Sequence, residues 1–247
     1  MRNLVTWKGG ASRPSLFCAM LVTAASAIAV AVAAAPVPAA PPGWAAVIPP
    51  PAAPGTIRFA TYNASLNRDA AGGLVRDLAT GTDDQARVIA AVLRQVRPDV
   101  LLINEFDYDE RHEALRLFHD LYLAAESAGD DAAPLRFAAS FTAPVNTGVP
   151  SGFDLDNDGR VGGGGDALGF GLFPGQYGLA VYSRFPIDRT SVRTFRQLRW
   201  RDMPGAVPPR GWYSAEEWAA LRLSSKSHWD LPLRVDAAHT IHQIGRA

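Results

Sequence analysis

The stretch Arg97-Pro-Asp-Val-Leu-Leu-Ile-Asn-Glu-Phe106 decides the fold. Its centre, Val100–Ile103, is a continuous apolar run between polar residues, which is typical of a strand buried on both faces. Such strands occur in α/β proteins, where other elements cover both sides of the sheet. Glu105 follows the run almost directly, so we expect its carboxylate at the C-terminal end of a central strand.

The residues before this strand predict another strand and then a helix. Residues 57–62 form a β-prone run, and Asn63 is expected where that strand opens into a loop. Thr82 and Gln85 have the spacing of a capping box, and apolar residues follow at helical spacing until Pro98 stops the helix. The order up to the central strand is therefore β-α-β.

The residues after the central strand predict one more helix and then mostly strands. Asp109 is placed to cap a helix that is expected to end near residues 127–131. Ser214 and Glu217 have capping-box spacing at the start of another short helix. Strands are expected at 177–183, at 190–198, at 231–235 and from 240–241 onward. This alternation predicts the α/β class.

The first 55 residues differ in composition from the rest. Residues 1–35 combine a basic start, an apolar run and small residues at its end, which predicts a signal peptide and a secreted, periplasmic or cell-surface protein. The alternative is an uncleaved membrane anchor, because an apolar helix of roughly 20 residues can span a bilayer. Residues 36–55 are rich in Ala and Pro and are expected to form a linker. The folded domain is expected over 56–247.

Charge and cysteine content narrow the function classes. Lys plus Arg and Asp plus Glu are both 24, so the chain has no bulk positive field that favours non-specific nucleic-acid binding. Cys18 is the only cysteine and lies in the segment expected to be removed. An exported domain without cysteine has no disulfide framework and no thiolate metal site, which leaves oxygen and histidine ligands and hence hard cations. No stable protein partner is indicated.

Three motifs follow one another along the chain. They are Thr61-Tyr-Asn-Ala-Ser-Leu-Asn67, the Arg97–Phe106 stretch, and Gly178-Leu-Ala-Val-Tyr-Ser-Arg-Phe-Pro-Ile187. Together they resemble motifs of the endonuclease/exonuclease/phosphatase family. The resemblance implies a deoxyribonuclease-I-like α/β fold, a four-layer sandwich in which helices flank two packed β-sheets. It also implies metal-assisted hydrolysis of a phosphoester.

The resemblance assigns roles to four residues. Asn63 is expected to bind or orient the phosphate and the metal-bound water, and Glu105 to ligate Mg²⁺ or Mn²⁺. Lys226 is a candidate contact to the phosphate, and His228 is a weaker neighbour in the same segment. By residue type alone, Asn63 equally suits a turn, Glu105 a solvated strand end, and Lys226 a solvated surface position.

A second metal pattern lies in the glycine-rich stretch Asp154-Leu-Asp-Asn-Asp-Gly159. Alternating carboxylates before a turn glycine match the opening of a Ca²⁺ loop; they belong to Asp154, Asp156 and Asp158. Gly165 occupies the twelfth position, where a closing Glu is usual, so closure by Asp166 requires an altered loop geometry or a water molecule. A solvated acidic loop is the alternative.

The resemblance stops before the last motifs of the family. That pattern continues with a strand ending in a catalytic His, an Asp-x-Asn pair and an Asp-His pair, and none of these occurs in the 247 residues. His242 is not expected to replace the catalytic His. We therefore expect a domain that is incomplete at its C-terminus and impaired in hydrolysis, because the general base and some metal ligands are missing.

Two non-catalytic functions compete with the hydrolase. One is a secreted Ca²⁺-binding remnant, and the other is an anchored surface module for interaction. For the hydrolase, nucleic acid, phospholipid and small phosphate esters all present the same phosphate, and the sequence does not choose among these substrates.

Overall fold

A computed structural model describes residues 53–126 and 132–246. The described residues all belong to one compact unit. The expected signal peptide or anchor, most of the linker and the helix end at 127–131 lie outside them. None of the helices in the described part is long and apolar enough to cross a membrane.

The first sheet has four strands in the order β1-β2-β4-β3. β1 (Phe59–Leu66) runs parallel to β2 (Val100–Phe106), and β4 (Leu179–Ser183) pairs antiparallel with β2 on one side and with β3 (Ala139–Phe141) on the other. The apolar run Val100–Ile103 is buried throughout, which confirms the expectation of a central strand covered on both faces.

The second sheet is an antiparallel arrangement of β5 (Arg193–Thr194), β6 (His228–Arg234) and β7 (Thr240–Arg246). The strand expected over 190–198 is reduced to β5, because a 3₁₀ turn over Arg189–Ser191 occupies its start. The strand expected from 240–241 onward is confirmed as β7.

Short helices connect the strands. They are α1 (Gly73–Ala79), α2 (Asp84–Val96), α3 (Glu113–Phe118) continued by a π-helical turn over His119–Leu123, a 3₁₀ turn over Trp200–Asp202, and α4 (Ala215–Ala220). The capping box of Ser214 and Glu217 at α4 is confirmed. Asp109 also acts as expected, since its carboxylate accepts the N–H groups of Glu113 and Ala114 at the start of α3. α1 was not predicted, because glycine stands at its first position.

The start of α2 differs from the expected capping box. Asp83 is the N-cap, and its Oδ1 accepts the N–H of Ala86 at 2.8 Å. The amide of Gln85 instead donates to the backbone oxygens of Ala64 and Ser65 in β1, at 3.2 and 2.9 Å. The Thr82–Gln85 box was therefore a wrong prediction, because a better cap lies between the two residues and Gln85 is engaged by the end of β1.

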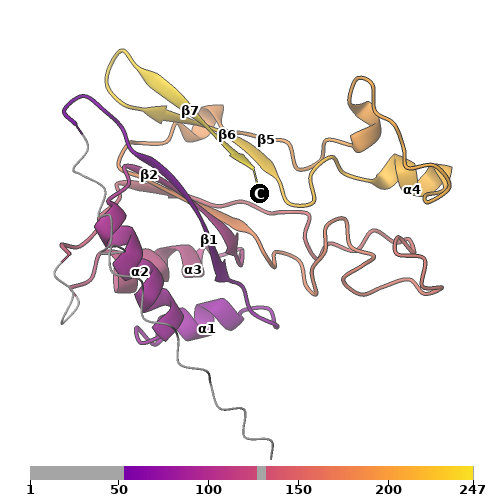
Figure 1. The fold of residues 1–247 in the computed structure, drawn as a ribbon, viewed down its shortest axis with the longest axis horizontal. Coiled ribbons are helices and arrows are strands. Elements are labelled where there is room, and N and C mark those ends of the chain that lie inside the picture. Colours follow the sequence, from indigo (N-terminus) through magenta and orange to yellow (C-terminus); the bar gives the residue numbers. More distant parts are fainter. Residues whose placement is uncertain (1–52, 127–131, 247) are drawn as a thin grey trace, which may run out of the picture. The chain divides into compact units, whose positions relative to one another are not determined.

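The described elements form three layers (Figure 1). Helices α1 to α3 cover one face of the first sheet, where the larger core cluster includes Leu78, Leu93 and Phe118. The second sheet packs on the other face, where Trp229 and Leu231 of β6 meet Leu102 of β2 and its neighbours. The α/β class with two packed sheets is thus confirmed, and the described elements supply three of the four expected layers.

Candidate active site

The parallel pair β1–β2 is irregular at its C-terminal end. The register passes from Asn63 opposite Asn104 to Leu66 opposite Phe106, so two residues of β1 stand against Glu105 alone. Ser65 and Glu105 both have left-handed backbones, with φ of 47° and 57°. Such strain in residues other than glycine is uncommon and concentrates at functional sites. The expected loop at Asn63 is corrected here, because Asn63 lies inside β1 just before this bulge.

The bulge brings two of the expected site residues together. Ser65 Oγ donates to Glu105 Oε2 at 3.4 Å, and the Ser65 N–H donates to Asn63 Oδ1 at 3.1 Å. Glu105 is half-buried and Asn63 is exposed. Ser65 thus joins the carboxylate to the amide oxygen, and the two side chains belong to one polar group at the end of the sheet.

Glu105 and Lys226 line the same pocket, although they come from different sheets. The pocket has a volume of about 360 Å³, and its walls are formed by Glu105, Thr147, Phe170, Tyr177, Ser225 and Lys226. Lys226 lies just before β6 and is half-buried. Burial lowers the pKa of Lys226, while the Glu105 carboxylate acts in the opposite direction and favours the ammonium form. His228, the first residue of β6, is not among these lining residues.

The lysine at this pocket is unusual for the chain. Lys8 and Lys226 are the only lysines, and every other basic side chain apart from histidine is an arginine. A lysine presents a compact ammonium with rotatable donors, whereas arginine presents a planar fork. Lys226 is therefore the one ammonium group in the family-like part of the sequence.

Glycines stand next to the pocket residues Thr147 and Phe170 and allow close backbone contacts there. A Cβ on Gly169 would lie 2.0 Å from the backbone oxygen of Ser225, and a Cβ on Gly148 would lie 1.8 Å from that of Phe173. Only glycine allows backbones to approach so closely. The wall residues Thr147, Phe170 and Tyr177 were not predicted as site residues. No local pattern in the sequence singles them out, because they reach the pocket through long-range backbone contacts at glycines.

Two hydroxyl groups near Lys226 lack hydrogen-bond partners among the described residues. They are Thr147 Oγ1 in the pocket wall and Ser227 Oγ next to the lysine, and both are buried. A buried hydroxyl without a partner costs about 1–3 kcal/mol, so it favours a ligand that supplies an acceptor. Thr147 adds an unsatisfied hydroxyl to the carboxylate and the ammonium of this pocket.

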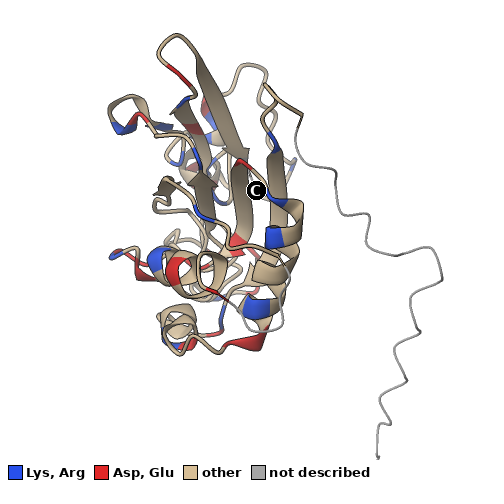
Figure 2. Cartoon of the chain, turned by 90° about the vertical axis from the view of Figure 1, so that its left-hand side faces the viewer, with Lys and Arg blue, Asp and Glu red and all other residues tan. Residues whose placement is uncertain are grey.

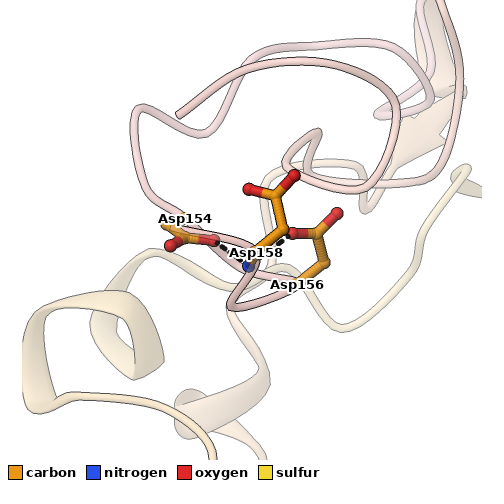
Figure 3. A group of neighbouring side chains, drawn as sticks. All are labelled: Asp154, Asp156 and Asp158. Carbon is orange, nitrogen blue, oxygen red and sulfur yellow. Dashed lines mark hydrogen bonds between the residues drawn. The ribbon is translucent and has the colours of Figure 1, made fainter. Parts of the chain in front are cut away.

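The acidic loop brings its three carboxylates together. One oxygen from each of Asp154, Asp156 and Asp158 lies within 4.8 Å of the others. The Asp158 N–H donates to both Asp154 and Asp156, at 3.0 and 3.2 Å (Figure 3). Gly159 has a φ of 86°, which provides the expected reversal. Among the described residues, this is the one group of at least three metal-ligating side chains so close together.

Asp166 is not a member of this group. Its Oδ1 accepts the N–H groups of Leu155 and Asp156, and its Oδ2 accepts that of Gly162. These bonds, that of Gly162 foremost, lower the pKa of the buried Asp166. A Cβ on Gly165 would lie 2.0 Å from an oxygen of Asp156, so a side chain there would displace that carboxylate. Asp166 holds the loop from inside, and its role as a metal ligand stays a prediction.

Comparison with known proteins decides the family. Residues 60–242 match the Endonuclease/Exonuclease/phosphatase family, which is most of the chain. The chain belongs to this family. No curated protein gives a significant match. The crystal structure of an endonuclease/exonuclease/phosphatase from Beutenbergia cavernae is 18% identical, covering 76% of this chain and 37% of that one with a TM-score of 0.34. The chain thus spans little more than a third of that enzyme's length.

Family membership makes phosphoester hydrolysis the class of activity to consider. The family match includes Asn63, Glu105, the acidic loop and Lys226. The roles of individual residues are not given by the match, so they rest on the geometry of this pocket. Lys and Arg positions and Asp and Glu positions both occur throughout the described chain (Figure 2), in keeping with the zero net charge.

Proposed function

We propose that this chain is a metal-dependent phosphoester hydrolase whose phosphate site is the pocket between Glu105 and Lys226. The observation that carries the proposal is that these two side chains, 121 positions apart in the sequence, line one pocket where the two sheets meet. A carboxylate suits a divalent cation and an ammonium suits the phosphate oxygens. Family membership independently indicates phosphoester chemistry.

The residues of the pocket fit Mg²⁺ or Mn²⁺. Glu105 offers one carboxylate. Asn63 does not line the pocket but is linked to Glu105 through Ser65, and it offers an amide oxygen that already accepts the Ser65 N–H. Mg²⁺ is commonly held by one or two carboxylates, with water and substrate phosphate filling its other positions. A bound Mg²⁺ or Mn²⁺ would neutralise charge on the phosphate. Glu105 would hold it, while Lys226 binds and orients the phosphate oxygens.

The same pocket predicts slow turnover. Its lining residues include neither a histidine nor a second carboxylate. A positioned general base typically contributes on the order of 10²–10⁴ in rate. We therefore propose that these 247 residues bind a phosphoester and a metal ion but hydrolyse the ester slowly.

The test separates binding from turnover. Selective ¹³C labelling of lysine gives signals from Lys8 and Lys226, and Lys226→Gln identifies the second. Methylphosphonate should shift the Lys226 signal, and Mn²⁺ should broaden it in the wild type but not in Glu105→Gln. Hydrolysis of plasmid DNA and of a chromogenic phosphodiester is measured with Mg²⁺ or Mn²⁺ in the same preparations.

The matched control is Glu216→Gln, which changes an exposed carboxylate in the first turn of α4. It should retain phosphonate binding, Mn²⁺ broadening and any turnover. Absence of a Lys226 shift at saturating phosphonate would contradict the phosphate site. Rapid turnover that is lost in Glu105→Gln would confirm the enzyme class but contradict the expected impairment.

We also propose that Asp154, Asp156 and Asp158 bind Ca²⁺. The support is the convergence of their oxygens and the backbone reversal at Gly159. Calorimetry should show Ca²⁺ binding and a higher Tm in its presence, because a ligand that binds only the folded state stabilises it. Asp156→Asn should weaken both effects, while Asp202→Asn in an exposed 3₁₀ turn should not. A Ca²⁺ titration that produces neither heat nor a change in Tm would contradict the site and show that the acidic loop is simply solvated.

Export is a further proposal that rests on the composition of residues 1–35. N-terminal sequencing of the protein recovered from a secreting host should find a start near residue 34. A soluble protein that retains Met1 would contradict it. The substrate is proposed only as a phosphoester, whether nucleic acid, phospholipid or a small ester.

A further inference from the structure

Two aromatic rings stand beside the carboxylate and the ammonium in the Glu105–Lys226 pocket. Phe170 and Tyr177 both line it, and their ring centroids are 6.4 Å apart with a tilt of 32° between the ring planes. Phe170 is 63% exposed, although it is a large apolar side chain. An apolar surface next to the charged end of a pocket suits a ligand that has one apolar part and one charged part.

Both rings are held by backbone that has little freedom to move. The Phe170 segment is fixed by the contact of Gly169 with Ser225 and by the hydrogen bond from Gly148 N–H to the Gly169 oxygen, at 2.9 Å. Tyr177 has a left-handed backbone with φ of 55°, and its N–H donates to Asp107 Oδ1 at 3.0 Å. A strained aromatic residue persists only where its surroundings determine it, and such strain is concentrated at ligand sites.

The size of the pocket limits what fits beside the phosphate. At about 360 Å³ it is near the lower end of the range for small-molecule sites. It accommodates a phosphate group and one ring system. A ring attached close to phosphorus would lie against Phe170 and Tyr177 while the phosphate contacts Lys226.

We propose that Phe170 and Tyr177 form a specificity surface that selects phosphoesters carrying a planar ring next to the phosphate. This inference rests on the proposed function, because it places the phosphate at Lys226. The ring belongs either to a simple aryl group or to a nucleoside, and the chemistry at the surface is the same. We expect about two- to twelvefold tighter binding of ring-bearing ligands, which corresponds to about 0.5–1.5 kcal/mol for a ring-on-ring contact.

The experiment uses the full chain labelled at lysine and follows the Lys226 signal. Dissociation constants are measured for methylphosphonate, phenylphosphonate and thymidine 5′-phosphate. Phenylphosphonate should bind about two- to twelvefold more tightly than methylphosphonate. In Phe170→Ala this ratio should fall toward one. Thymidine 5′-phosphate binding more tightly than phenylphosphonate would identify the ring as that of a nucleoside, and the reverse order as a simple aryl group.

Two control variants test whether the difference in binding comes from the aromatic rings. Leu172→Ala removes another exposed apolar side chain from the same segment, outside the pocket lining, and should leave the ratio intact. Tyr177→Phe retains the ring and should also keep it. Equal binding of all three ligands, or a ratio that survives Phe170→Ala, would overturn the specificity surface while leaving the phosphate site standing. Failure of the phosphate site is recognised separately, as a Lys226 signal that saturating methylphosphonate does not shift.

Discussion

At the scale of single residues, a buried carboxyl lies directly behind the pocket. Asp107 accepts the N–H groups of Arg68 and Tyr177, at 2.8 and 3.0 Å, and so connects the end of β1 to the aromatic wall. Desolvation by burial raises its pKa from 3.8 to about 6, although the two hydrogen bonds act in the opposite direction. Burial makes the ionisation of Asp107 unfavourable, but its hydrogen bond fixes the position of Tyr177.

This pKa predicts a dependence of stability on pH. The folded-state pKa lies above the unfolded value, so the native protein binds more protons between pH 3.8 and about 6, and stability falls as pH rises through about 6. Relative to Asp107→Asn, the wild type should lose on the order of 2 kcal/mol between pH 4.5 and 7.5. Urea unfolding of both proteins over this range measures it. A constant difference at all pH values would show that Asp107 does not titrate near 6.

At the scale of elements, the cap of α2 offers a direct test of local structure. Asp83 accepts the N–H of Ala86 and also lies 3.3 Å from the guanidinium of Arg68. Asp83→Ala should lower the free energy of unfolding by about 1 kcal/mol, which is typical for loss of an N-cap. Thr82→Ala should have a much smaller effect, and Asp83→Asn should recover most of the loss. Equal losses of unfolding free energy in Asp83→Ala and Thr82→Ala would show that Thr82 contributes to the cap of α2 as much as Asp83 does.

The elements also show what the sequence was able to predict. β2 follows from its apolar run, and α4 from its capping box, because both signals are local. The bulge at Glu105 was missed, since it depends on how β1 and β2 pair rather than on either strand alone. The pairing of Glu105 with Lys226 was implied only by resemblance. Thr147, Phe170 and Tyr177 enter the pocket through long-range backbone contacts at glycines, which no periodicity records.

At the scale of the whole molecule, Trp229 connects the two sheets. It is fully buried, packs edge-on against Phe141 at 5.0 Å between ring centroids, and belongs to the cluster that joins β6 to β2 and β4. Its Nε1 is buried and has no hydrogen-bond partner among the described residues. The indole therefore stabilises the fold through packing alone, and the unpaired Nε1–H group lowers the stability.

The size of the side chain at position 229 should therefore decide how firmly the sheets hold together. Trp229→Ala should destabilise the protein by about 3–5 kcal/mol, the usual range for removing a large buried aromatic side chain. Trp229→Phe should cost much less, because it keeps most of the volume and removes the unpaired N–H. Urea unfolding of the three proteins measures the order. A Phe variant as unstable as the Ala variant would indicate that Nε1 has a partner after all.

The close backbone contacts at Gly148 and Gly169 divide the pocket into positions that can change and positions that cannot. No side chain can be added at either glycine without displacing backbone, whereas Phe170 and Leu172 reach outward from the same segment. Substitutions at Phe170 or Leu172 can therefore change the exposed side chains of this segment without disturbing the backbone contacts near Lys226. A new substrate preference, whether it arises in evolution or in a laboratory library, should therefore come from substitutions at Phe170. Substitutions at Gly169 should not be tolerated.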